Sequence, residues 1–457
     1  MNIKENLSTS NKGKSMKKLL STIAIAAFLS LQTACDDSSS STTTPTNSPL
    51  VNGTNERSLV VVISDIHLGA DIAYAEINKN LTHLKNFLEQ VRVSPNVKEL
   101  IIGGDLLDEW FVPAGVDTYQ GKDQKDFVKR IATTNKIVVD VINQIITEKK
   151  ILVTYVPGNH DLTITADNVN EIFPGINQAR DEGKVGLGTY SSAFMPALAV
   201  EHGHRFNFYC APDPISNSTI ASGSIMPPGY FYTRLATEHV VQKCTTSADV
   251  IKQVTILPDA DLSQQNAFKY WKTWANSANS YPINNMFNEK IFVTNIDGFT
   301  EKYSVNDFMP YQDAPGGTIQ MKLFNNIQNT WEERQTANNV AVHIDVVRAI
   351  DSVASFRETN YQAKVQYFTN PNSDKRIVVF GHSHMAGIEA SQNNAGQKCI
   401  YANSGTWIDN AHKLYPTTAN FVVITPQNSN ATSQTIVKLY NFENGVYNFM
   451  KADSLRY

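Results

Sequence analysis

Along residues 58–161, short β-branched runs alternate with longer segments of helical periodicity. The runs "SLVVVISD" and "ELIIGGD" each predict a buried strand that ends at an aspartate, and "KILVTYVPGNHD" predicts a third strand. Between them, apolar residues recur at helical spacing over 74–91 and again over 124–149. This alternation predicts βαβ units on a largely parallel sheet. In such sheets, ligands gather at the carboxyl ends of the strands.

The regular alternation stops after a fourth predicted strand in "ALAVEHGHRF". From about 211 to 374 the chain is richer in Asn, Pro and aromatic residues, with helical patterns around 266–275, 320–334 and 338–367. Strand-like runs resume in "RIVVFGH", "KCIYANSG", "NFVVITP" and "SQTIVKLYNF". We therefore expect one domain over residues 58–457, interrupted at about 211–374 by a mostly helical insertion or cap. Such an insertion would shape substrate choice.

The N-terminal region has the pattern of a targeting segment. From Met16, two lysines precede an apolar run and small residues before Cys35. The run is shorter than the roughly 20 apolar residues needed to cross a bilayer. Residues 1–35 resemble a bacterial lipoprotein signal with lipidation at Cys35, and the Ser/Thr-rich residues 36–57 predict a flexible linker. A conventional cleaved signal or an ordinary buried Cys35 are the alternatives. We expect an exported protein, anchored by lipid in the bacterial cell envelope.

Net charge and cysteine content narrow the set of partners. A formal net charge of −4 gives no general attraction to nucleic acid or to an anionic membrane. We therefore expect no nucleic-acid partner, and membrane contact only through the lipid anchor. Beyond Cys35 the chain has Cys210, Cys244 and Cys399 without a CxxC pair, which disfavours a thiolate zinc site. Cys210 and Cys244 could pair in an oxidising compartment.

Polar motifs follow the predicted strands. They are Asp65 and His67 in "SDIHLG", Asp105 in "GGDLLDEW", Asn159 and His160 in "GNHD", His202 in "EHGHRF", and His382 and His384 in "GHSH". Taken singly, each has an ordinary structural explanation, such as an aspartate that caps a helix or an Asn-His pair in a turn. Their combination at successive strand ends indicates one shared site.

The donor types point to metal ions. Without a cation, two carboxylates, an amide oxygen and four imidazoles at adjoining strand ends would crowd anionic groups together. Oxygen and nitrogen donors without sulfur suit divalent Mn, Fe, Zn, Ni or Co. Seven donors exceed the needs of one tetrahedral ion and fit two ions that share a bridging carboxylate. Two such ions can stabilise both the attacking and the leaving oxygen of a displacement at phosphorus.

The motif order DxH, GDxx, GNHD, H and GHxH resembles that of the calcineurin-like metallophosphoesterase superfamily. The resemblance implies an α/β fold with two mixed β-sheets packed as an αββα sandwich. It implies that Asp65, His67 and His384 bind one ion, that Asn159, His202 and His382 bind the other, and that Asp105 bridges them. His160 would be the acid or electrostatic group near the leaving oxygen. A metal-bound hydroxide would attack the phosphorus of a small phosphorylated substrate.

The motifs leave the substrate open. Monoesters, diesters, nucleotides and the pyrophosphate linkage of sugar nucleotides are all compatible with them. A noncatalytic binding module on the same fold would be expected to lack His160 or several ligands, and this sequence has them all. A nuclease would need a positive surface near the site, which no Lys/Arg run supports. No substrate-binding residue is assigned. Arg205 and Arg234 could contact phosphate, because guanidinium matches its geometry, or could be surface residues.

Overall fold

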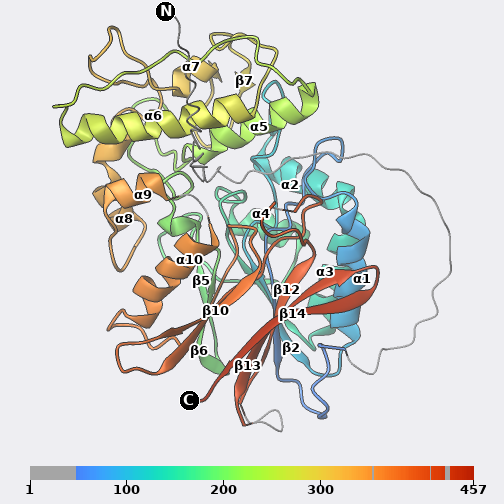
Figure 1. Cartoon of the computed structure of the whole chain (residues 1–457). Helices are drawn as coiled ribbons and strands as arrows, with labels where there is room; N and C mark the ends of the chain where they lie inside the picture. Colours follow the sequence, from blue (N-terminus) through green and yellow to red (C-terminus); the bar gives the residue numbers. More distant parts are fainter. Residues whose placement is uncertain (1–47, 353–354, 412, 428–432) are drawn as a thin grey trace, which may run out of the picture.

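The computed structural model describes residues 48–352, 355–411, 413–427 and 433–457, and two mixed β-sheets form its centre (Figure 1). The first sheet has the order β14 (Val446–Leu455), β13 (Thr435–Glu443), β12 (Asn420–Thr425), β1 (Leu59–Ile63), β2 (Val97–Gly103), β3 (Leu152–Val156), β4 (Asn177–Gln178). The second has the order β10 (Gly387–Gln392), β11 (Lys398–Asn403), β9 (Ile377–Phe380), β6 (Met195–Glu201), β5 (Thr189–Ser192). The predicted α/β fold with two packed mixed sheets is confirmed.

Parallel pairing occupies one half of the first sheet and the middle of the second. Strands β1, β2, β3 and β4 run parallel in the first sheet, as the βαβ pattern predicted for its first three strands. In the second sheet, β9 pairs in parallel with both β6 and β11. The fourth predicted strand, β6, therefore leaves the first sheet and lies beside a strand from the far end of the chain. This crossover brings the carboxyl ends of β6 and β9 next to each other.

Helix α1 (Asn80–Val93) begins six residues later than the apolar pattern over 74–91 predicts. The carboxylate of Asp409 accepts hydrogen bonds from the backbone N–H groups of Asn78, Lys79 and Asn80. These contacts satisfy the free donors at the helix start from a distant segment, as a capping side chain does locally. The preceding residues form a loop that stays close to the end of β1.

The single long helix predicted over 124–149 is two helices, α2 (Gln124–Thr134) and α3 (Lys136–Glu148). Asn135 lies at the joint, and its side-chain amide donates to the carbonyl oxygens of Gly69 and Ile131. The apolar periodicity continues across the joint, so the pattern alone cannot reveal the break. The contact with Gly69 fixes the joint against the loop that follows β1.

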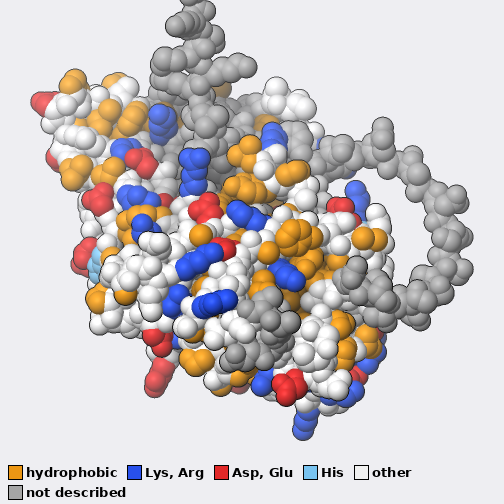
Figure 2. All heavy atoms as spheres, turned by 60° about the horizontal axis from the view of Figure 1, so that its bottom comes forward, with side chains coloured by type: hydrophobic (Ala, Val, Ile, Leu, Met, Phe, Trp, Pro, Cys, Tyr) orange, Lys and Arg blue, Asp and Glu red, His pale blue; other side chains and the backbone are white. Residues whose placement is uncertain are grey.

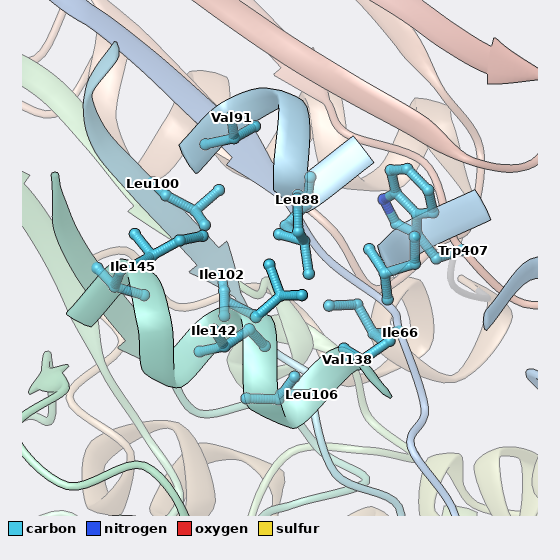
Figure 3. Packing of buried hydrophobic residues seen from close by; sticks show 14 of the residues in the cluster. Ile66, Leu88, Val91, Leu100, Ile102, Leu106, Val138, Ile142, Ile145 and Trp407 are labelled. Atoms are coloured by element: carbon cyan, nitrogen blue, oxygen red, sulfur yellow. The ribbon is translucent and has the colours of Figure 1, made fainter. Parts of the chain in front are cut away.

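Apolar side chains form the interfaces between the layers. Figure 3 shows Leu88 and Val91 of α1 and Ile142 and Ile145 of α3 packed over Ile102 of β2, on the outer face of the first sheet. A separate buried cluster from strands of both sheets fills the space between them. Phe356 packs on Tyr401 of β11 at the outer face of the second sheet. The layer order is therefore αββα.

The insertion forms a separate aromatic core at one end of the sandwich (Figure 1). The elements of this core are α5 (Gly229–Gln242), α6 (Leu262–Ser280), the hairpin β7 (Phe292–Val293) and β8 (Lys302–Tyr303), α7 (Val305–Phe308), α8 (Trp331–Ala337) and α9 (Val346–Asp351), whereas the last helix of the insertion, α10 (Phe356–Ala363), packs on the second sheet. Of the pattern over 320–334, only the part from Trp331 onward is α-helical, and 338–367 contains two short α-helices. Long irregular stretches, such as 243–261, connect these helices.

The folded body begins before the predicted linker ends. Leu50 is buried in the core beneath α1, and the side chain of Asn96 bonds the backbone of Asn52, Thr54 and Glu56. Residues 48–57 therefore pack on the domain, in contrast to the flexible linker predicted up to residue 57. The predicted signal segment with Cys35 lies outside the described residues. Within the described part of the chain, no helix is long and apolar enough to cross a membrane.

Cys210, Cys244 and Cys399 are free thiols, so the disulfide considered between the first two is not formed in this structure.

On the face turned forward in Figure 2, basic side chains lie among uncharged and hydrophobic ones, with acidic groups between them.

Candidate metal centre

The seven predicted metal ligands lie at the carboxyl ends of strands from both sheets. Asp65 and His67 follow β1, Asp105 follows β2, Asn159 follows β3, His202 follows β6, and His382 and His384 follow β9. The structure brings all of them into one cluster, in which six are buried and His384 is partly exposed. Sequence spacing therefore identified a set of residues that the fold assembles from segments more than three hundred residues apart.

The first group of predicted ligands is Asp65, His67 and His384. The Nε2 atom of His384 lies 3.3 Å from Oδ1 of Asp65 and 3.3 Å from Nε2 of His67. Donor atoms bound to one ion at about 2.0–2.2 Å are roughly 3.0–3.5 Å apart in tetrahedral or octahedral geometry. The spacing of these three atoms therefore suits one shared cation, and their donor types suit a divalent one.

The second group is Asn159, His202 and His382. The amide oxygen Oδ1 of Asn159 lies 3.1 Å from Nε2 of His202 and 2.8 Å from Nδ1 of His382. These separations are again of the order expected around one ion. The two histidines of "GHSH" thus face different groups of ligands: His384 faces Asp65 and His67, and His382 faces Asn159.

Asp105 lies between the two groups. Its Oδ2 atom is 3.0 Å from Nε2 of His202 and 3.6 Å from Nε2 of His67. Its Oδ1 atom accepts a hydrogen bond of 2.8 Å from the backbone N–H of His160. One carboxylate oxygen therefore faces a histidine from each group, which is the arrangement that a bridging ligand requires.

Hydrogen bonds at the far side of two rings fix where their lone pairs point. Nδ1 of His202 lies 2.9 Å from the carbonyl oxygen of Gly103, which can only accept, so this nitrogen carries the proton. The Nε2 lone pair of the neutral ring then faces the oxygens of Asp105 and Asn159. In His67, carboxylates at Nδ1 likewise leave Nε2 as the acceptor. When both rings are neutral, acceptor atoms therefore converge without a donor, which fits a bound cation.

Charge coupling within the cluster is strong. Burial opposes protonation of His67, but the carboxylates of Glu76, Asp108 and Asp105 raise its pKa to about 10. Burial also opposes protonation of His202, whereas Asp105 and Asp65 raise its pKa to about 9. In the metal-free protein, protons on these rings therefore balance the buried carboxylates. A metal ion has to displace them, so metal binding should release protons.

The backbone at the site is strained. Asp65, His67, Asp105, His382 and His384 adopt positive φ angles of 52°, 55°, 51°, 67° and 58°. Residues with a Cβ rarely occupy this region, at a cost of about 1 kcal/mol or more each, and such residues cluster at functional sites. Neighbouring glycines allow the close packing, because a Cβ at Gly158 would overlap the Asp105 carboxylate and one at Gly381 would overlap that of Asp65.

His160 lies beside the ligand cluster and is held from two sides. Its Nδ1 atom is 2.9 Å from Oδ1 of Asp108, and its ring stacks on Trp110 with centroids 4.9 Å apart. Burial lowers the pKa of His160, but the carboxylates of Asp108 and Asp105 together raise it above the ordinary value. The predicted acid thus has a partner that favours its protonated form.

Asp108 and Trp110 were not among the predicted site residues. Asp108 contacts two site histidines, since its Oδ2 atom is also 3.2 Å from Nδ1 of His67. A signal was present in the sequence, because Asp108 and Trp110 follow Asp105 within the same loop, "GGDLLDEW". No sequence feature placed either side chain against His160, since that contact depends on the neighbouring strand β3.

Other polar residues near the motifs support the loops. Asp161 accepts the backbone N–H groups of Leu106, Leu107 and Gly158, which joins the loops after β2 and β3. The amide of Asn403 donates to the carbonyl oxygen of Gly381 and to the Ser383 hydroxyl, inside the "GHSH" turn. These side chains hold the backbone that carries the ligands.

Both arginines considered as phosphate contacts or surface residues are buried and engaged within the protein. Arg205 pairs with Glu201 and with Asp181. Arg234 donates to backbone carbonyl oxygens of Pro113, Ala114, Val116 and Val293. Neither of the two sequence-based interpretations of these residues is correct, and both arginines instead fix segments that pack around the site.

Comparison with known families agrees with this geometry. Residues 58–238 match the family model for the calcineurin-like phosphoesterases. The matched range contains Asp65, His67, Asp105, Asn159, His160 and His202. His382 and His384 lie beyond it, and the structure returns them to the site through β9. No curated protein matches the chain. The match supports the superfamily, whose members generally use divalent metals to hydrolyse phosphoesters.

Proposed function

We propose that the protein hydrolyses phosphate esters with two divalent metal ions. One ion would be held by Asp65, His67 and His384, the other by Asn159, His202 and His382, with Asp105 between them. The observation that carries the proposal is the position of the Asp105 Oδ2 atom, 3.0 Å from His202 Nε2 and 3.6 Å from His67 Nε2. When bound, the ions supply positive charge for the phosphate oxygens and an acidified water as nucleophile.

The protein side chains supply proton control and orientation. Asp108 accepts from Nδ1 of His160, so Nε2 is the nitrogen left to face a substrate. The Asp108 carboxylate raises the pKa of His160 and so favours the protonated ring, from which Nε2–H can be donated to the departing oxygen. Trp110, stacked on the same ring, restricts its rotation. His160 is therefore proposed as the general acid that protonates the leaving alcohol.

The segments that surround the metal site, rather than the metal ligands, should determine which phosphate esters the protein accepts. Monoesters, diesters including nucleotides, and sugar-nucleotide pyrophosphates all present a phosphorus to the same centre. The insertion over about 211–374 contributes α5, whose Gly229 packs closely on Trp110, since a Cβ there would lie 3.1 Å from the Trp110 ring. We propose that this segment selects the alcohol portion of a small phosphorylated substrate. A noncatalytic role is disfavoured, because His160 and all seven ligands are present together.

A metal-reconstituted activity screen tests this function. Purified protein is stripped of metal, reloaded with Mn²⁺, Fe²⁺, Zn²⁺, Ni²⁺ or Co²⁺, and assayed on aryl phosphate mono- and diesters, nucleotides and sugar-nucleotide diphosphates. We expect metal-dependent release of the alcohol or phosphate product, abolished by chelation. His160→Ala should lower kcat by about 10²–10⁴-fold while metal content is unchanged. His343→Ala, at an exposed histidine bonded to Glu332, is the matched control. Failure of the wild-type protein to bind any divalent metal would refute the proposal.

We also propose that the protein is exported and anchored in the bacterial cell envelope through a lipid on Cys35. The proposal rests on the charged, apolar and small-residue pattern that precedes this cysteine. Mass spectrometry of the mature protein from cell envelopes should find an N-terminal diacylated cysteine. An unlipidated N-terminus, or cleavage at another residue, would rule out the anchor.

A further inference from the structure

Glu76 contacts a metal ligand from a loop outside every recognised motif. The loop connects β1 to α1, and the Oε2 atom of Glu76 lies 3.2 Å from Nδ1 of His67. Its side chain is only 9% exposed, and His67 is fully buried. The backbone carbonyl of Glu76 accepts a 2.9 Å hydrogen bond from the N–H of Asp409, the residue that also caps α1. The position of Glu76 is therefore set by two fixed elements.

A second carboxylate competes for the same hydrogen. The Oδ2 atom of Asp108 is also 3.2 Å from Nδ1 of His67, although an imidazole Nδ1 carries one hydrogen. The other oxygen of Asp108 accepts from the backbone of Trp110 and Phe111 and contacts Nδ1 of His160. Asp108 is thus shared between two histidines. Among the described residues, Glu76 has one site histidine within hydrogen-bond distance, His67.

We propose that Glu76 is the positioning residue of His67, an inference that rests on the two-metal function above. Its carboxylate holds the Nδ1–H of His67, which fixes the tautomer that turns the Nε2 lone pair toward Asp65 and His384. A carboxylate behind a metal-binding histidine makes the ligand more basic and typically changes metal affinity by about 10–100-fold. Glu76 thereby strengthens the ion of the first group alone and leaves Asp108 available to orient His160.

A third metal ion is the competing explanation for this cluster. Donor atoms of His67, Glu76, Asp108 and His160 all lie within 4.8 Å of one another. Such an ion would need Nδ1 of His67, while the two-metal site already uses Nε2 of the same ring. It would also displace the hydrogens that the Nδ1 atoms of His67 and His160 share with carboxylates at 3.2 and 2.9 Å. Hydrogen bonding accounts for these distances without a further ion.

Metal titration separates these alternatives without recourse to activity. Metal-free wild-type protein, Glu76→Gln and Glu76→Asp are titrated with Mn²⁺ by calorimetry, and bound metal is counted by elemental analysis. Wild type should bind two equivalents. We expect Glu76→Gln to weaken one of them by about 10–100-fold and to leave the other unchanged. Glu76→Asp keeps the charge but shortens the side chain, so it should weaken the same ion. Glu99→Gln, at a buried glutamate bonded to Ser192 near the start of β2, is the control.

Combined variants identify which ion responds. In a His382→Ala background, Glu76→Gln should still weaken the remaining ion by the full factor. In a His384→Ala background, it should have no further effect, because the ion it supports is already lost.

Equal weakening of both ions, or unchanged affinity, would overturn the proposal. Binding of three equivalents by wild type, with one lost in Glu76→Gln, would establish the third ion instead. If wild type binds none, the two-metal function itself fails; if it binds two and Glu76→Gln matches it, only the role of Glu76 fails.

Discussion

His382 and His384 are one residue apart, yet their side chains serve different groups of ligands. The intervening turn gives both residues positive φ angles, 67° and 58°. His384 turns its Nε2 atom to Asp65 and His67, whereas His382 turns Nδ1 to Asn159. The "GHSH" motif therefore completes both groups at once. On a regular strand, two residues at positions i and i+2 would point to the same face of the sheet, so the turn is what directs the two rings to different groups.

Single substitutions in this pair should remove different ions. We expect His384→Ala chiefly to weaken the ion held by Asp65 and His67, and His382→Ala the ion held by Asn159 and His202. The physical reason is that each ring supplies one donor to one group. Calorimetric titration of the metal-free variants with Mn²⁺ checks this, with His343→Ala as a control. Loss of both ions in either variant would show that the two groups do not bind independently.

Glu109 is a buried carboxyl group next to the site, and its side chain is hydrogen-bonded to residues outside the site. Its oxygens accept hydrogen bonds from Tyr119, Gln124 and Thr163, and burial, opposed by these bonds, raises its pKa to about 7. Between the ordinary value of 4.5 and about 7, the folded protein keeps a proton that the unfolded chain has lost. Because the folded state then binds more protons, the stability contributed by this group falls as pH rises through that window.

Replacement of Glu109 should remove the part of the pH dependence of the unfolding free energy that this carboxyl group causes. Glu109→Gln cannot ionise, so its free energy of unfolding relative to wild type should improve between about pH 5 and pH 8. The improvement should reach at most roughly 3 kcal/mol, from 1.36 kcal/mol per pKa unit. Urea denaturation at both pH values with a chelator present measures it, and Glu332→Gln, at an exposed carboxyl, is the control. Parallel pH profiles for wild type and Glu109→Gln would contradict the prediction.

Strand ends were predictable from the sequence, whereas the contacts between loops were not. The β-branched runs that end at Asp65 and Asp105 gave the strands and their polar ends, because period and branching are local properties. The start of α1 depends on Asp409 and the break after α2 depends on Asn135 bonded to Gly69, both distant in sequence. The roles of Glu76 and Asp108 depend on the same kind of contact, so they became visible only in three dimensions.

Helix α5 of the insertion packs on the loop that carries Asp108 and Trp110. Arg234 of α5 donates to the carbonyl oxygens of Pro113, Ala114 and Val116 in that loop. A Cβ at Gly229, the first residue of α5, would lie 3.1 Å from the Trp110 ring and 2.9 Å from the carbonyl oxygen of Tyr209. Through Trp110, whose ring stacks on His160, the insertion therefore bears on the position of the proposed acid.

An added methyl group at Gly229 should disturb this stack. We expect Gly229→Ala to lower kcat by about tenfold or more while both metal ions stay bound, because a displaced Trp110 releases His160 from its orientation. Overpacking should also cost about 1–3 kcal/mol of stability. Steady-state kinetics and elemental analysis measure the two effects. Gly115→Ala is the control, since a Cβ there meets no atom within 4 Å. Unchanged kcat in Gly229→Ala would mean that the insertion does not act on His160.

The predicted metal ligands come from both sheets of the sandwich. Asp65, Asp105 and Asn159 come from the first sheet, whereas His202 and His382 come from the second. In the metal-free protein, Asp65 and Asp105 are buried, and nearby histidines together with backbone N–H groups of His382 and His160 compensate their charge. Bound ions would replace this partial compensation by direct bonds across the interface between the sheets. Metal binding should therefore stabilise the whole molecule rather than the loops alone.

Chelation should lower the thermal stability of the entire domain. An ion present at 100 times its dissociation constant stabilises the folded state by about 2.7 kcal/mol, so two ions give roughly 5 kcal/mol. Differential scanning calorimetry with Mn²⁺ and then with excess chelator should show a single transition that moves down by several degrees. His343→Ala should shift as wild type does. Asp105→Asn should shift far less, because it removes the carboxylate oxygen that faces both groups. A metal-independent transition in wild type would show that the sheets pack without help from the site and that the cluster binds metal weakly or not at all.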